Sequence, residues 1–236
     1  MTSLGSRSDP APRKPRGADA GMQMSSETET KRRVPRGDVR RRELARVAEE
    51  VFLETGFADT TMQMIASRAG ASKETLYRHF ASKEALFAEI MKERATALAG
   101  PGSAFARGQT PRKALGELGL NLLRMMIHGK APAIFRIVVA ETPRNPTLGA
   151  LFYSGGPGTV LERLTEYLRV ETARGELRCR RPDQAARLFL GAVMANHHLL
   201  ALVAPPDKPI TDRDLQAHVR AAVALFLARY GKGSSS

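Results

Sequence analysis

The stretch that decides the fold is residues 60–83, TTMQMIASRAGASKETLYRHFASK. Thr60 and Gln63 form a capping box, which predicts that a helix starts directly after Thr60. Gly70 suits the left-handed backbone that ends a helix. Ser72 can then cap a second helix. The stretch therefore predicts two short helices joined by a tight turn.

The two short helices should each have an apolar inner face. The residues at helical spacing are Met64, Ile65 and Ala69 in the first helix and Leu76 and Phe80 in the second. The other faces of the second helix carry Lys73, Thr75, Tyr77, Arg78 and His79. A short helix with such a polar and basic outer face suits a DNA groove, so the pattern predicts a helix-turn-helix.

Several motif pieces resemble the TetR family of bacterial transcriptional regulators. Residues 70–80, GASKETLYRHF, followed by residues 82–87, SKEALF, resemble the recognition-helix signature of that family. The resemblance extends back through residues 61–66, TMQMIA, and residues 48–57, AEEVFLETGF. It implies a three-helix DNA-binding domain, a helical ligand-binding and dimerisation domain, a homodimer and a double-stranded DNA operator.

Side-chain chemistry divides the DNA-facing residues into two groups. Hydroxyl, imidazole and ammonium donors suit phosphates, and we assign Thr60, Thr61, Tyr77, His79 and Lys83 to them. The base readers are then Lys73, Glu74, Thr75 and Arg78, beside the capping Ser72. The resemblance also implies that Arg40 lies near DNA and that Lys83 contacts a phosphate. The alternative is that Lys83 is an ordinary surface lysine. Many relatives carry glycine where Glu74 stands, so the role of this acid stays open.

Composition favours a polyanionic partner and a reducing compartment. The 236 residues carry a formal net charge of +13, which points to nucleic acid. The single cysteine, Cys179, excludes an internal disulfide, and the arginines around it could lower its pKa. Residues 1–37 lack the apolar core of a signal peptide, and the apolar run 188–204 is too short and too polar for a membrane span. We expect a cytoplasmic, nucleoid-associated protein without a membrane partner.

The rest of the chain predicts helices and no strand, so the expected fold class is all-α. Residues 1–37 form a disordered basic tail, 38–84 the helix-turn-helix domain, 85–231 the effector-binding and dimerisation domain, and 232–236 a second disordered tail. Residues 31–33, KRR, and Arg36 could add phosphate contacts or reach a minor groove, and a solvated tail is the alternative. Helices are expected over 38–55, 82–98, 111–128, 132–142, 148–153, 160–175, 183–203 and 211–230, with a turn at 155–158. Gly56 should end the first of these helices, and Ser82 should cap the second.

The second domain predicts a pocket and a dimer interface. Residues 135–141, FRIVVAE, resemble an AcrR-like subgroup. The candidate pocket residues are Met125, Met126, Phe135, Val139, Phe152, Tyr153, Asn196 and His197; plain core is the alternative for the apolar ones. Asn196, His197 and His198 interrupt an apolar helix, so they could bond a ligand, each other or a second subunit. Adjacent histidines point to different faces of a helix, so we predict no metal site and no cofactor. The last two helices either pair across a two-fold axis or form internal core.

These patterns together predict a regulator that binds a near-palindromic operator as a dimer and is released by a small apolar effector. A repressor is favoured over an activator. The sequence shows no nucleophile elbow, phosphate loop or HExxH motif, so an enzyme is not expected. Two rivals stay open: a charge-driven nucleoid-type binder, and a regulator controlled by a partner protein.

Overall fold

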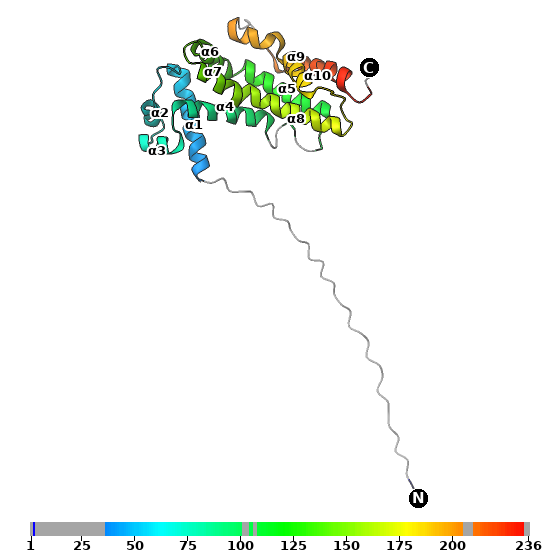
Figure 1. The fold of residues 1–236 in the computed structure, drawn as a ribbon, viewed down its shortest axis with the longest axis horizontal. Helices are drawn as coiled ribbons and strands as arrows, with labels where there is room; N and C mark the ends of the chain where they lie inside the picture. Colours follow the sequence, from blue (N-terminus) through cyan, green and yellow to red (C-terminus); the bar gives the residue numbers. More distant parts are fainter. Residues whose placement is uncertain (1, 3–35, 101–103, 106–107, 205–209, 234–236) are drawn as a thin grey trace. The chain divides into compact units, whose positions relative to one another are not determined.

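The computed structural model describes residues 2, 36–100, 104–105, 108–204 and 210–233 (Figure 1). These residues form helices and no strand, apart from an isolated antiparallel bridge between Leu177 and Gly231. The predicted all-α fold class is therefore confirmed. The predicted phosphate contacts of residues 31–33 lie outside the described residues.

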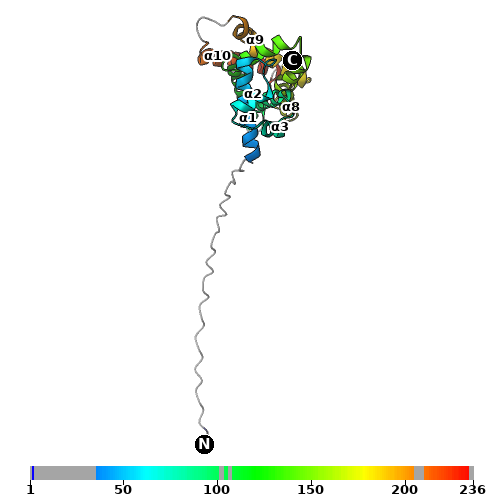
Figure 2. The same ribbon diagram turned by 90° about the vertical axis from the view of Figure 1, so that its left-hand side faces the viewer.

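The N-terminal helices form the predicted helix-turn-helix. They are α1 (Arg36–Thr55), α2 (Met62–Arg68) and α3 (Lys73–His79), which lie together at the left in Figure 1; Figure 2 looks onto this side of the molecule. Gly56, at φ 80°, ends α1, and Gly70, at φ 56°, ends α2, as predicted. The rings of Phe52, Phe57 and Phe87 pack together with centroids 5.2–6.1 Å apart and join these helices to α4 (Lys83–Ala99).

The start of α2 differs from the prediction by one residue. Thr61, rather than Thr60, is the cap, and its hydroxyl oxygen accepts a hydrogen bond from the Met64 backbone at 3.2 Å. Thr60 is buried, and its hydroxyl donates to the Gly56 carbonyl at 2.6 Å. The inner face consequently begins at Met62, and Met64 is exposed. The capping-box pattern was wrong here because the loop after α1 turns the Thr60 side chain inward.

The remaining helices form the body of the subunit. They are α5 (Pro111–Ile127), α6 (Ala131–Glu141), α7 (Pro146–Tyr153), α8 (Thr159–Ala173), α9 (Pro182–Val203) and α10 (Asp212–Tyr230). Buried Leu, Val and Phe side chains of α5, α8, α9 and α10 make one core. A Cβ atom on Gly119 of α5 would lie 3.0 Å from Val219 and 3.2 Å from Val193, so this glycine permits the close approach of three helices.

The predicted boundaries between parts do not coincide with breaks in the structure. α4 runs through residue 84, the predicted domain boundary, so the division at that residue stays a prediction. Arg36 and Gly37 belong to α1, and Lys232 pairs with Glu176 at 2.9 Å, although all three were placed in the tails. The expected turn at residues 155–158 is wrong: Ser154–Gly158 is a π-helical turn that connects α7 directly to α8.

α9 is interrupted near its C-terminal end. Ala195 has φ 35° and ψ −131°, far from helical values. One turn earlier, Nε2 of His218 in α10 lies 2.9 Å from the Val193 carbonyl oxygen and 3.1 Å from that of Ala192, so an N–H there donates to both. At the end of α9, the Arg136 guanidinium of α6 donates to the carbonyls of Ala201 and Leu202. His218 of α10 thus binds carbonyls before the break, and Arg136 of α6 binds carbonyls after it.

Candidate DNA-binding surface and effector cavity

α3 presents one polar face to solvent. Ser72 caps the helix by accepting a hydrogen bond from the Thr75 backbone at 3.0 Å, as predicted. Leu76 and Phe80 are buried and fix the rotation of the helix. The predicted DNA contacts on α3 and its cap are accessible to solvent. The exposed ones are Ser72, Lys73, Glu74, Tyr77 and Arg78, and the half-exposed ones are Thr75 and His79. The exposed Thr61 caps the neighbouring α2. Donors, acceptors and cations therefore share one surface.

Lys83 is engaged inside the molecule. Its Nζ donates to the carbonyl oxygens of Phe57 at 2.7 Å, Ala58 at 2.9 Å and Thr60 at 3.1 Å. An ammonium group has three donors, so no donor remains for the predicted phosphate contact in this arrangement. Lys83 instead ties the first turn of α4 to the loop between α1 and α2. Thr60 also lies in this loop, and its burial keeps its side chain from a phosphate.

The arginines at the start of α1 also make internal contacts. Arg40 donates to Glu43 at 2.7 Å and to the Ala69 carbonyl at 3.2 Å, which joins α1 to the end of α2. Arg41 lies 4.2 Å over the Phe80 ring and donates to the His79 carbonyl at 2.6 Å. Its second bond, to Glu89, lowers the pKa of that carboxyl group. The recognition helix is thereby fixed to α1 and α4.

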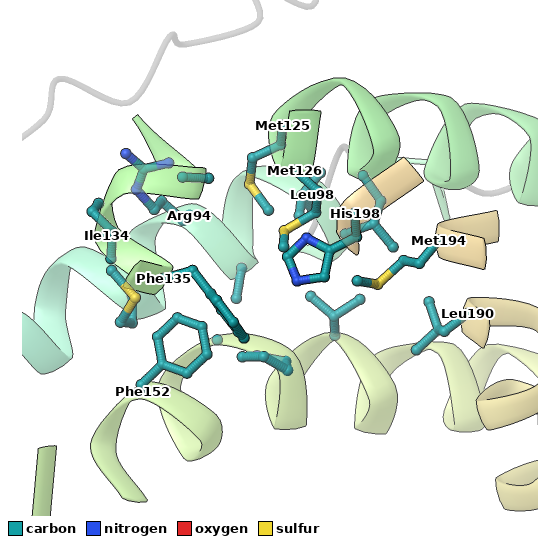
Figure 3. A pocket seen from close by; sticks show the side chains of 17 residues that line it. Arg94, Leu98, Met125, Met126, Ile134, Phe135, Phe152, Leu190, Met194 and His198 are labelled. Carbon is teal, nitrogen blue, oxygen red and sulfur yellow. The ribbon is translucent and has the colours of Figure 1, made fainter. Parts of the chain in front are cut away.

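A cavity of about 160 Å³ lies in the body, between α4, α5, α6, α8 and α9 (Figure 3). Its wall is almost entirely apolar, and four of the predicted ligand residues contribute to it: Met125, Met126, Phe135 and Phe152. An engineered apolar cavity of about 150 Å³ binds benzene, which sets the scale of a molecule that this space accommodates.

The other four predicted ligand residues lie elsewhere. Val139 and Tyr153 are each 56% exposed, because the buried faces of their helices contain Val138 and Leu148 instead. Asn196 is exposed, and His197 packs its ring 4.6 Å from that of His218. A helical rotation of about 100° per residue separates Val139 from the buried Val138 and Tyr153 from the cavity residue Phe152. None of these four side chains lines the cavity.

His198 is a cavity residue that was not among the eight predicted ligand contacts. Its ring packs edge-on against Phe135 with centroids 4.9 Å apart, and it follows Leu190 and Met194 along the same wall (Figure 3). Burial lowers the pKa of the His198 imidazole. The spacing of four between residues 190, 194 and 198 was the signal in the sequence that could have identified this face.

The cavity adjoins the core beneath the DNA-binding helices. Met91 of α4 and Ile134 of α6 line the cavity and also belong to the apolar cluster that includes Phe52 and Leu76. Arg94, which lines the cavity as well, donates to Glu49 of α1 at 2.9 Å. Lys130, directly before α6, lies 3.3 Å from the same carboxylate. The cavity wall and the DNA-binding helices therefore share side chains and an ionic network.

α9 and α10 leave large apolar side chains exposed. These are Leu188, Leu199 and Val203 in α9 and Leu225 in α10, each more than half exposed. By length and composition alone α9 could cross a membrane, which differs from the sequence expectation, and 17% of its most apolar window is buried in the subunit. An exposed apolar face of this kind is a typical site of association with another surface.

Cys179 is buried, and burial raises the pKa of its thiol. The expectation that neighbouring arginines lower this pKa is therefore wrong. Desolvation disfavours the thiolate more strongly than a hydrogen bond with Thr172 favours it. A thiol in these surroundings is poorly reactive.

Comparison with known proteins agrees with this geometry. Residues 44–90 match the family described as bacterial regulatory proteins, tetR family. Residues 113–232, about half of the chain, match the C-terminal domain of AefR-like transcriptional repressors. The C-terminal relationship is thus to an AefR-like group, where the sequence resemblance suggested an AcrR-like one.

Individual relatives cover different parts of the chain. FasR, a transcriptional activator of Mycolicibacterium smegmatis, is 45% identical over 60 residues, which span 25% of this chain and 27% of FasR. The flavonoid-responsive regulator FrrA is 32% identical with a TM-score of 0.67, covering 83% of this chain and 99% of FrrA. A TetR-family regulator structure from Mesorhizobium loti is 26% identical with a TM-score of 0.70, covering 84% and 99%. The chain therefore belongs to the TetR family of bacterial transcriptional regulators, and it is a DNA-binding regulator rather than an enzyme.

Proposed function

We propose that the protein is a ligand-responsive repressor that binds a near-palindromic operator as a homodimer and is released by a small apolar effector. Each subunit would place α3 in one major groove, with the two half-sites about 34–36 Å apart. Lys73, Glu74, Thr75 and Arg78 would contact bases, and Thr61, Tyr77 and His79 would contact phosphates. The match to a repressor C-terminal domain supports this sign of regulation.

The observation that carries this proposal is the wall shared by the cavity and the DNA-binding helices. Met91 and Ile134 contact the cavity on one side and pack into the helix-turn-helix core on the other. A ligand that displaces them moves α4 and α6 relative to α1. The ligand must bind the non-DNA arrangement more tightly by the coupling free energy, which is about 1–3 kcal/mol in typical allosteric proteins.

The exposed apolar residues of α9 and α10 support the dimer. A two-fold axis beside these helices would bury Leu188 and Leu225 against their counterparts and would hold two α3 helices at a fixed separation. The same surface explains why α9 is apolar over most of its length without being buried in the subunit. A second subunit gives this face an apolar partner while the body of the protein stays in water.

The first test is fluorescence anisotropy with the promoter fragment beside the protein's own gene and a scrambled duplex, both titrated across salt. A specific repressor stays on the promoter at a salt concentration that releases the scrambled DNA. Equal and steeply salt-dependent binding to a panel of flanking promoters and to scrambled DNA would contradict the proposal and favour a charge-driven binder. A library screen for release of the promoter fragment then tests the effector.

The ion pairs of Glu49 with Arg94 and Lys130 allow a test of whether the cavity is coupled to α1. Glu49→Gln weakens the contact of α1 with Arg94 and Lys130, so we expect the effector concentration needed for DNA release to change severalfold, since side chains along such routes change coupling by about 0.5–2 kcal/mol. Glu50→Gln is the matched control, because Glu50 is more exposed and pairs mainly with Arg46 on its own helix. Equal release curves for Glu49→Gln and the unmodified protein would argue against this route.

A further inference from the structure

The cavity wall contains an imidazole nitrogen without a partner. Nδ1 of His198 is buried and has no hydrogen-bond partner among the described residues. The ring faces the space between Met126, Phe135 and Met194 (Figure 3). Buried polar atoms in folded proteins nearly always find a partner, and an unpaired one costs about 1–3 kcal/mol. A group that enters the cavity can supply the missing bond.

The chemistry of an imidazole restricts that group. The ring is partly buried in apolar surroundings, which favours its neutral form, with one nitrogen protonated and the other able to accept. A hydroxyl both donates and accepts, so it satisfies Nδ1 in either tautomer. The rest of the ligand must be apolar, because the wall around His198 consists of thioether, aromatic and aliphatic side chains.

A carboxylate ligand fits the cavity less well. Arg94 is the only cationic side chain on the wall made by the described residues, and its Nε and Nη2 already donate to Glu49. Glu49 already compensates the charge of this guanidinium, so a carboxylate would lose its hydration beside a cation whose charge is largely neutralised. The size of the cavity, about 160 Å³, further limits the ligand to about one ring unless the methionines rearrange.

We propose that His198 selects effectors of the phenol class, with the aromatic ring among Met126, Phe135 and Phe152 and the hydroxyl bonded to Nδ1. The proposal rests on the effector cavity proposed above and specifies its ligand. His198 is then the specificity-determining residue of the cavity, and the apolar wall supplies most of the binding free energy.

Phenol and toluene are suitable probes because they differ by one hydroxyl in place of one methyl group. The full chain has nine methionines, and Met91, Met125, Met126 and Met194 line the cavity, so ¹³C-methyl methionine NMR reports binding at this site. A purely apolar cavity would bind phenol about tenfold or more weakly than toluene, because the buried hydroxyl would be unpaired. With His198 as its partner, we expect phenol to bind at least as tightly as toluene.

His198→Phe removes the nitrogen and keeps an aromatic ring. We expect phenol to weaken by about tenfold while toluene changes less than about threefold. Met194→Leu, on the same wall, is the matched control and should affect both probes alike. Benzoate should bind more weakly than phenol to the unmodified protein.

The outcomes separate this inference from the proposed function. Toluene binding with phenol tenfold weaker, an unchanged ratio in His198→Phe, or benzoate tighter than phenol would overturn the assignment to His198 and leave the effector cavity in place. No methionine shift with any probe, in a protein that still binds its promoter, would overturn the cavity as an effector site as well. Promoter binding is measured separately and does not depend on the probes.

Discussion

The two ends of the subunit differ in how they use their polar groups. At the helix-turn-helix end, the side chains of Arg40, Arg41 and Lys83 donate hydrogen bonds to backbone carbonyls and carboxylates inside the fold. These bonds hold α3 rigidly, with its polar face toward solvent. In the body, apolar side chains surround a cavity and an imidazole nitrogen stays unpaired. A rigidly held recognition helix suits a fixed DNA groove, and an apolar cavity lined by methionines suits an adaptable response to a ligand.

The largest expected effect comes from disrupting the exposed face of the body. Leu188→Glu combined with Leu225→Glu places two charges on the proposed dimer face in each subunit. We expect monomers in analytical ultracentrifugation and operator binding weaker by about a hundredfold or more, because one half-site is lost. Val139→Glu, at an equally exposed position of α6, should stay dimeric. A dimeric double variant with normal operator affinity would place the interface elsewhere.

Lys83 tests whether the rigidity of the reading end depends on internal bonds. Lys83→Met removes three charge-assisted donors, and we expect a loss of about 1.5–3 kcal/mol in the free energy of unfolding, measured by denaturant titration without DNA. Lys73→Met, at an exposed site on α3, should lose less than about 0.5 kcal/mol. If Lys83→Met keeps its stability and loses only DNA affinity, Lys83 is a phosphate contact after all.

Two neighbouring residues of α3 should separate sequence readout from general DNA affinity. Arg78→Ala should cost about 1–3 kcal/mol at the operator and relax the preference at one base pair. Tyr77→Phe keeps the ring and removes only the hydroxyl, so the loss should be smaller and equal for all sequences. Anisotropy on operators with single base-pair changes measures both. A changed base preference in Tyr77→Phe, with none in Arg78→Ala, would exchange the two assignments.

The smallest expected effect is a dependence of the protein's stability on pH, caused by two histidines of the body. The pKa values of His197 and His198 are lowered in the folded state by burial, so well above about pH 6.5 both are neutral in the folded and unfolded chains. As the pH falls below 6.5, the unfolded chain binds protons first and stability decreases. Thermal melts at pH 7.5 and 5.5 should show a smaller decrease for His198→Phe than for the unmodified protein. Equal decreases would mean that His198 carries no shift.

The sequence predicted best where a structure depends on neighbours along the chain. Gly56, Gly70, Ser72 and Ser82 were assigned correctly because a turn or a cap depends on a few adjacent residues. The internal bonds of Lys83 could not be predicted, because its partners, residues 57–60, are more than twenty positions away and only folding brings their carbonyls within reach.

The cavity was predictable only in part, for the same physical reason. Met125, Met126, Phe135 and Phe152 could be named as apolar residues on helices, but the rotation of each helix decides which side chain enters a shared space. Tertiary packing sets that rotation. As a result, His198 lines the cavity, whereas its neighbour His197 contacts His218.

The break in α9 also bears on how fast a ligand could exchange. Residues 196–203 follow the irregular backbone at Ala195 and are held at their far end by the Arg136 guanidinium. A segment attached in this way can open locally at a free energy well below that of global unfolding. Because His198 lies within it, such an opening would uncover the cavity. The residence time of an effector would then follow the opening rate of one helical segment, so that Arg136 affects the duration of a response while His198 affects its specificity.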